Sequence, residues 1–231
     1  MPNYCFNEVR GPKKVLEDLY MDGKITFQKL TPMPKSLMLE EGSKTEKAVL
    51  YAVLKKDFDT RNKLIQFLSS ITEHNGNNYW NKLINRFSLY EINGLDKALE
   101  KLEKEQEKFV PDEDEEAIGI KTFEELGDTY IDNLSKYKCM TWYDWSIKNW
   151  GTKWDAFECQ GTPEDGVLAF VTAWTPPEPI IHKLLEKYSK EEIEWEYEEE
   201  GMSLKGRYWT DGKGNIEEEQ LEIEYDEEEE Y

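Results

Sequence analysis

Apolar side chains alternate with glutamates near the end of the chain, and this alternation limits the folds that the chain can adopt. Residues 193–198 read IEWEYE, and residues 216–225 read IEEEQLEIEY. A period of two is typical of a β-strand with one buried and one solvated face. Between them, MSLKGRYW (202–209) is also strand-like, and TDGKGN (210–215) has the glycines of a hairpin turn that joins it to the last strand. The pattern therefore predicts a three-strand meander with one acidic, wet face.

The rest of the chain mixes strand and helix patterns. Strand-like stretches are YCFNEVRG (4–11), KITFQKL (24–30), KWDAFECQ (153–160) and VLAFVTAW (167–174). The last is apolar on both faces, as an interior strand is. Helical spacing follows in 13–20, in three or four segments between 43 and 109, in 121–137 and in 180–188. Thr141 with Asp144, and Thr175 with Glu178, have the spacing of capping boxes and predict two further helix starts.

This order of elements predicts an α+β fold. Strands whose helices are segregated to one face form a two-layer sandwich, and a split β-α-β arrangement is ferredoxin-like. We expect a ferredoxin-like antiparallel sheet with helices on one face, formed by residues 1–42 and 122–231. Residues 43–121 would be an inserted helical subdomain that ends in the acidic linker VPDEDEEAIG (110–119).

Charge is concentrated at the C-terminal end. The chain of 231 residues has a formal net charge of -21, of which -15 falls in residues 191–231. Such a field repels nucleic acid and membrane surfaces and attracts basic proteins. The N-terminus lacks the apolar core of a signal peptide, and Cys5, Cys139 and Cys159 form neither a disulfide framework nor a zinc motif. We therefore expect a soluble, cytoplasmic protein; its oligomeric state is left open.

A tryptophan-rich segment, WYDWSIKNWGTKWDAF (142–157), has two interpretations. Five tryptophans belong to it or to the following strand: Trp142, Trp145, Trp150, Trp154 and Trp174. We expect Trp154 to enter a strand that faces Trp174. Because burying each indole removes roughly 150–250 Å² from water, a core is the favoured interpretation. The alternative is a pocket in which these rings stack on a nucleotide.

Motifs for catalysis are absent from the sequence. His74, expected in a loop, and His182, expected on a helix, belong to no metal-binding or hydrolase pattern. Asp144, Asp155 and Glu158 flank the tryptophans and could act as an acid–base pair, although a capping role accounts for Asp144. We therefore expect no enzyme activity, no cofactor and no metal.

Three stretches together resemble a known family. They are MPNYCFNEVRG (1–11), WSIKNWGTKWDAF (145–157) and FVTAWTPPEPII (170–181), and KITFQKLTPMPKSL (24–37) fits as well. The chain resembles the YubB-like ferredoxin-like domain family of bacterial plasmids and phages over residues 1–39 and about 139–210. The resemblance implies the fold and a mobile-element setting, and it supplies no catalytic residues. The helical insertion and the acidic end lie outside the pattern.

The acidic strands carry the main hypothesis about function. Seven glutamates would form a rigid array on one face: Glu194, Glu196, Glu198, Glu217, Glu219, Glu222 and Glu224. Such an array can imitate the phosphates of a nucleic acid and occupy a basic cleft. We expect a non-enzymatic phage or plasmid protein that binds and inhibits a basic, nucleic-acid-binding host protein, such as an antiviral CRISPR-type effector. The alternative is a small-ligand module that holds a nucleotide among the tryptophans.

Overall fold

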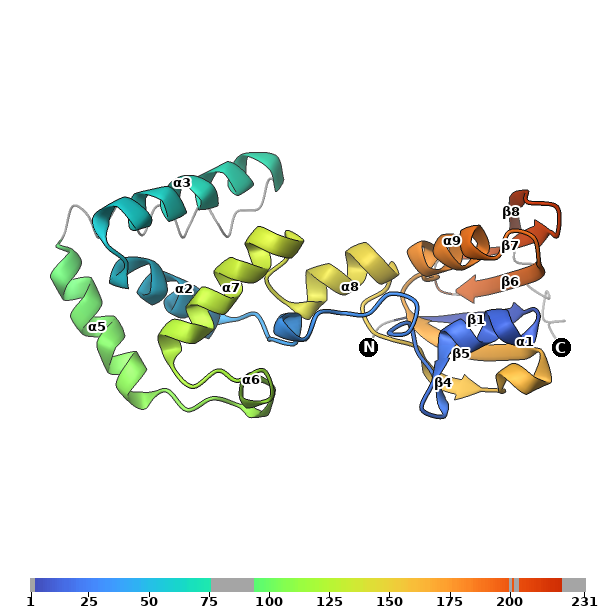
Figure 1. The fold of residues 1–231 in the computed structure, drawn as a ribbon, viewed down its shortest axis with the longest axis horizontal. Coiled ribbons are helices and arrows are strands. Elements are labelled where there is room, and N and C mark those ends of the chain that lie inside the picture. The colour runs from blue at the N-terminus through green and yellow to red at the C-terminus, as the bar shows by residue number, and fades with distance from the viewer. Residues whose placement is uncertain (1–2, 76–93, 200, 202–203, 222–231) are drawn as a thin grey trace, which may run out of the picture. The chain divides into compact units, whose positions relative to one another are not determined.

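Two compact units make up the chain (Figure 1). A computed structural model describes residues 3–75, 94–199, 201 and 204–221. The α/β unit contains residues 1–33 and 143–231, and the helical unit contains residues 34–142. The helical unit thus extends beyond the insertion expected at 43–121, at both of its ends.

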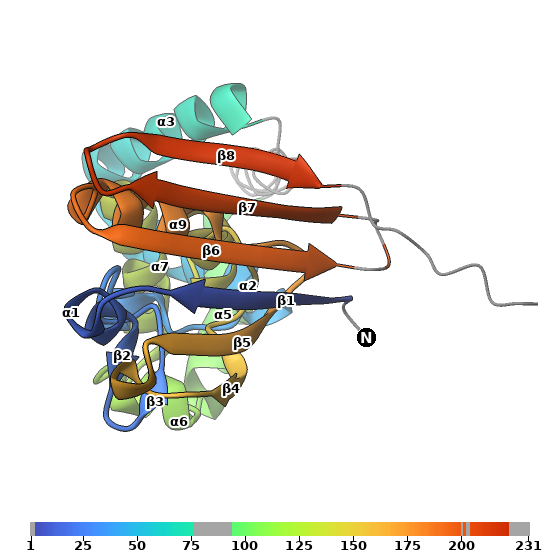
Figure 2. The same cartoon turned by 90° about the vertical axis from the view of Figure 1, so that its right-hand side faces the viewer.

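A six-stranded antiparallel sheet forms the centre of the α/β unit, with strand order β4-β5-β1-β6-β7-β8 (Figure 2). The strands are β1 (Tyr4–Arg10), β4 (Phe157–Gln160), β5 (Val167–Ala173), β6 (Glu192–Glu199), β7 (Leu204–Asp211) and β8 (Ile216–Leu221). The predicted meander is present, and β5 is an interior strand. Residues 222–225 of the predicted last strand lie outside the described residues.

Helices α1 and α9 give the sheet a ferredoxin-like topology. Helix α1 (Lys13–Leu16) follows β1 and continues as a 3₁₀ turn, Glu17–Leu19, whereas α9 (Glu178–Lys187) connects β5 to β6. The order β1-α1-β4-β5-α9-β6, with β1 between β5 and β6, is the split β-α-β-β-α-β arrangement. The fold is therefore ferredoxin-like and α+β, with β7 and β8 extending the sheet beyond β6.

A buried polar network fixes the register of β1. Asn7 Nδ2 donates to Thr172 Oγ1 of β5 at 2.9 Å, and Asn7 Oδ1 accepts a hydrogen bond from Trp195 Nε1 of β6 at 3.2 Å. Asn7, Thr172 and Trp195 are all buried. Because an unpaired polar group is costly in such a site, one amide joins the three central strands in a single alignment.

The structure differs from the sequence-based predictions in one strand and in two capping boxes. The predicted strand 24–30 is reduced to β3 (Lys24–Ile25), which pairs with β2 (Tyr20–Met21) in a separate two-stranded hairpin. Both predicted capping boxes are wrong. Thr141 Oγ1 is buried without a hydrogen-bond partner, and the Thr175 hydroxyl donates to Gly151 O at 2.7 Å instead of capping α9.

The segment after α8 (Trp142–Trp150) is tied to the end of β5 by threonines. Thr152 Oγ1 donates to Ala173 O at 2.9 Å and accepts from Ala173 N at 3.0 Å. Gly151 has φ of 81°, and a Cβ there would lie 2.5 Å from Pro179 Cδ. The motifs WGTKW and TAWTPP are therefore joined by threonine hydroxyls of each motif that hydrogen-bond to the backbone of the other, which gives them a structural role.

The helical unit is built around the crossing of α2 and α7. Among its described residues, the helices are α2 (Ser43–Lys55), α3 (Phe58–Asn75), α5 (Leu95–Lys108), α6 (Glu113–Ala117) and α7 (Phe123–Tyr137). The acidic segment 110–119, expected to be a linker, contains α6, which is capped reciprocally by Asp112 and Glu115. A Cβ at Gly127 of α7 would lie 2.1 Å from Ala48 O. This close approach explains why α7 belongs with the helical unit.

We expect Gly127→Ala to destabilise the helical unit by about 1–3 kcal/mol, because the added methyl overpacks the α2–α7 contact. Intrinsic helix propensity favours alanine over glycine and would act in the opposite direction. Hydrogen exchange of the α2 amides measures the change. Ser135→Ala, at an exposed position of the same helix, is the control and should leave exchange nearly unchanged. Equal exchange in the two variants would contradict the close packing.

We expect Thr152→Val to lower the free energy of unfolding by about 1–3 kcal/mol, because the Ala173 N–H and C=O both lose their side-chain partner. Thr152→Ser keeps the hydroxyl and loses one buried methyl, which costs about 0.8 kcal/mol. Urea denaturation followed by tryptophan fluorescence compares the two variants. A valine variant that is as stable as the serine variant would show that the hydroxyl does not hold β5.

Candidate functional site

The candidate site is the face of the sheet opposite α1 and α9, which we call the open face. Cross-strand partners share a face, so the register assigns its members. They include Tyr4, Phe6, Glu8 and Arg10 of β1; Glu192, Glu194, Glu196 and Glu198 of β6; Lys205, Arg207, Trp209 and Asp211 of β7; Glu217, Glu219 and Leu221 of β8; and Val167, Ala169, Val171 and Ala173 of β5.

The structure places the predicted glutamates of β6 and β8 on this one face. Glu194, Glu196 and Glu198 alternate with the buried Ile193, Trp195 and Tyr197. Glu217 and Glu219 of β8 stand opposite Trp209 and Arg207 of β7, which in turn stand opposite Glu194 and Glu196. Glu222 and Glu224, the remaining members of the predicted array, lie outside the described residues.

Three cations are interleaved with these carboxylates. Lys205 Nζ lies 2.6 Å from Glu198 Oε2, and Arg207 Nη2 lies 2.7 Å from Glu219 Oε2. Arg10 Nη1 lies 3.2 Å from Glu196 Oε2 and also pairs with Glu8 and Glu194. The array is therefore a lattice of ion pairs across the strands, whereas the sequence suggested a row of bare carboxylates.

The open face is nevertheless acidic. Its named members include eight carboxylates and three cations. The hydrogen bond from Arg10 to Glu196 raises the pKa of the Arg10 guanidinium, and Glu219 does the same for Arg207, so both stay charged. Exposed ion pairs of this kind each contribute about 0–1 kcal/mol to stability. A partner can therefore replace them at low cost.

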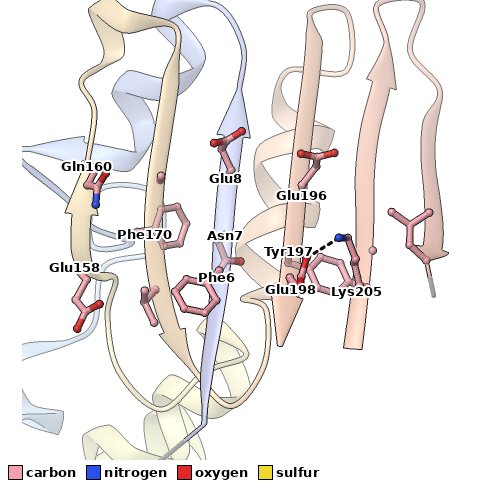
Figure 3. A pocket seen from close by; sticks show the side chains of 14 residues that line it. Phe6, Asn7, Glu8, Glu158, Gln160, Phe170, Glu196, Tyr197, Glu198 and Lys205 are labelled. Carbon is pink, nitrogen blue, oxygen red and sulfur yellow. Dashed lines mark ion pairs between the residues drawn. The ribbon is translucent and has the colours of Figure 1, made fainter. Parts of the chain in front are cut away.

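A shallow groove crosses the open face at one end of the strands (Figure 3). It has a volume of about 410 Å³, and Phe6, Ala169, Val171 and Leu221 supply its apolar surface. The Phe6 side chain is 51% exposed although it lies on an interior strand. Carboxylates stand around this apolar strip: Glu8, Glu158, Glu196 and Glu198. The arrangement fits an apolar side chain flanked by basic ones.

The five tryptophans do not form a common pocket. Trp145 and Trp150 are buried and meet edge to face at 5.5 Å, and Trp150 Nε1 donates to Thr31 O at 2.9 Å. Trp142 is half-buried and donates to Glu40 Oε1 at 3.2 Å. Trp154 and Trp174 are exposed. Both were expected to lie in strands, but β4 begins at Phe157 and β5 ends at Ala173. None of the five lines the groove on the open face, and the nucleotide interpretation stays a prediction.

The candidate catalytic groups have structural roles or lie apart. Asp155 accepts hydrogen bonds from Thr26 Oγ1 at 2.5 Å and from Phe27 N at 2.8 Å, which anchors the segment after β3. Asp144 is exposed on α8, and Glu158 lies in β4 with φ of 51°. His74 lies in α3, not in a loop as expected. Over the described ranges, no three His, Cys, Asp or Glu residues are grouped to hold a metal ion, and no helix is long and apolar enough to cross a membrane.

Sequence reasoning missed the residues of β1 and β7 on the open face. Tyr4, Phe6, Glu8 and Arg10 have the spacing of one strand face, and that signal was available. It did not say that β1 would lie directly beside β6. Likewise, the predicted meander set the strand with Lys205 and Arg207 between two acidic strands, but only the register places these two cations opposite the glutamates.

One comparison with known proteins, that with a family model, agrees with the ferredoxin-like fold. No curated protein matches the chain. Among solved structures, the crystal structure of the protein api92 from Yersinia pseudotuberculosis is similar at 12% identity and a TM-score of 0.39, covering 97% of this chain and 100% of that one. Residues 149–231 match the family model described as the ferredoxin-like domain in Api92-like protein, so over this segment the chain is similar to Api92-like proteins.

Proposed function

We propose that the chain is a non-enzymatic, cytoplasmic interaction protein whose open face binds a basic protein. The observation that carries this proposal is the groove, in which the exposed Phe6 is surrounded by Glu8, Glu158, Glu196 and Glu198. An exposed apolar side chain within a polar rim is typical of protein-binding surfaces. The surrounding negative field selects a partner that carries lysines or arginines.

Charge density separates this surface from a close copy of nucleic acid. Carboxylates two residues apart on a strand repeat about every 6.8 Å, whereas one strand of B-DNA carries a charge about every 3.4 Å. Arg10, Lys205 and Arg207 lower the net density further. We therefore propose that the open face recognises its partner through Phe6 and the carboxylates together. The negative charge, which resembles that of a nucleic acid, would attract the partner over long range.

The resemblance to the YubB-like family supports a plasmid or phage origin. For a protein from such a source, a nucleic-acid-binding host protein is a basic partner whose inhibition would be useful. We propose a host defence protein, for example a CRISPR-type effector, as the class of partner. Occupation of its basic cleft by the open face would block nucleic acid without any chemical step.

The test is a pull-down from host lysate over a salt gradient, followed by mass spectrometry, with two double variants of equal net charge. We expect the wild type to retain a basic protein that elutes as salt rises. Glu196→Gln with Glu198→Gln should weaken retention about tenfold, since the loss of two partly paired charges is worth about 1.4 kcal/mol. The control variant carries Glu103→Gln and Glu107→Gln at exposed positions of α5, and it should retain the basic protein as the wild type does.

A second variant separates the apolar anchor from charge. We expect Phe6→Ser to weaken binding at high salt as well as at low salt, because the apolar contact is not screened. Two outcomes would overturn the proposal. One is equal loss in the α5 control and the β6 variant, and the other is the absence of any retained basic protein at low salt.

A further inference from the structure

A second hollow lies on the other side of the sheet, between α9 and strands β7 and β8. Its volume is about 610 Å³, and it is lined by Glu178, His182, Tyr197, Tyr208, Glu218, Glu219 and Gln220. The register explains its position: Glu218 stands opposite Tyr208, and Gln220 stands opposite Gly206, on the face that carries α9. Glu217 and Glu219 of the same strand belong to the open face, so β8 contributes to both surfaces (Figure 2).

Aromatic rings form one wall of this hollow. The rings of His182 and Tyr208 meet edge to face with centroids 5.3 Å apart, and those of Tyr197 and Tyr208 lie 5.8 Å apart at 31°. Gly206 makes room for this arrangement, because a Cβ at that position would lie 2.4 Å from Tyr197 Oη. Three rings from α9, β6 and β7 are therefore held together by packing.

Carboxylates supply the charge. The Tyr208 hydroxyl donates to Glu178 Oε1 at 3.4 Å, and Glu218 lies on the neighbouring strand. Burial, followed by the charge of Glu178, raises the pKa of Tyr208 well above its ordinary value. The hydroxyl stays protonated and adds no charge of its own. No lysine or arginine is among the described residues that line the hollow.

We propose that this hollow is a binding site for an organic cation with a guanidinium group, such as an arginine side chain or a small guanidine compound. Tyr197 and Tyr208 are buried, so a planar cation can lie against the exposed ring of His182 while its N–H groups donate to Glu178, Glu218 and the Gln220 amide oxygen. Aromatic walls distinguish this site from one for a hard metal ion, which requires oxygen ligands around it. The site lies on the opposite face from the groove, so it does not depend on the proposed function.

Titration with two nearly isosteric probes tests the site. Arginine amide carries the guanidinium, whereas citrulline amide replaces it with a neutral urea group. We expect arginine amide to bind saturably, with a Kd of roughly 1 mM for one cation–π contact and one or two charged hydrogen bonds. Two-dimensional NMR of the labelled full chain should show shifts for the amides of β7, β8 and α9. Citrulline amide should produce no saturable shifts.

Neighbouring residues of β8 provide matched variants. Glu218→Gln should weaken binding of arginine amide about fivefold or more, since a charge-assisted hydrogen bond becomes a neutral one. Glu217→Gln removes the same charge from the open face and should leave the affinity unchanged. If both variants weaken the binding of arginine amide equally, only the overall negative charge of the protein attracts this cation. That result, or equal binding of citrulline amide, would overturn the proposal.

Discussion

The hydrogen bonds of Asn7 are the constraint on which both faces of the sheet depend. Asn7 links β1 to Thr172 of β5 and to Trp195 of β6, in the centre of the sheet. A shift of β1 by one residue would turn Asn7 to the open face and Phe6 under the helices. It would leave the buried Trp195 N–H without an acceptor. Core packing therefore decides which side chains of β1 reach the open face.

This constraint also joins distant parts of the chain. Residues 4–10 pair with residues 167–173 and 194–198, and the whole helical unit lies between them in the sequence. The entropic cost of closing a loop rises only slowly with its length, so the sheet tolerates an insertion of this size. The two hydrogen bonds of Thr152 with Ala173, and that of Thr175 with Gly151, are formed where the chain returns to the sheet. The tryptophan-rich motif has its structural explanation here.

Local patterns in the sequence predicted where strands and helices occur better than they predicted which elements pack against each other. Alternation identified β6 and the start of β8, and the apolar run at 167–174 identified β5 as an interior strand. The capping predictions at Thr141 and Thr175 failed because each threonine had a tertiary environment that spacing does not encode. Gly127 gave no sequence signal for its role, since its importance comes from the Ala48 carbonyl of another helix.

The sequence predicted the negative charge of the open face, but it did not predict which cations would pair with the glutamates. Glutamates at alternate positions of β6 had to share a face, because the strand period is two. That Arg10 of the first strand would reach Glu196 depended on the strand order, and that Lys205 and Arg207 would face the glutamates depended on the register of β7. The same order produces the apolar strip, because it sets Phe6 beside Val171 of β5 and Glu198 of β6. The sequence of no single strand shows this strip. Together with the carboxylates around it, the strip gives the open face an apolar centre as well as a negative charge.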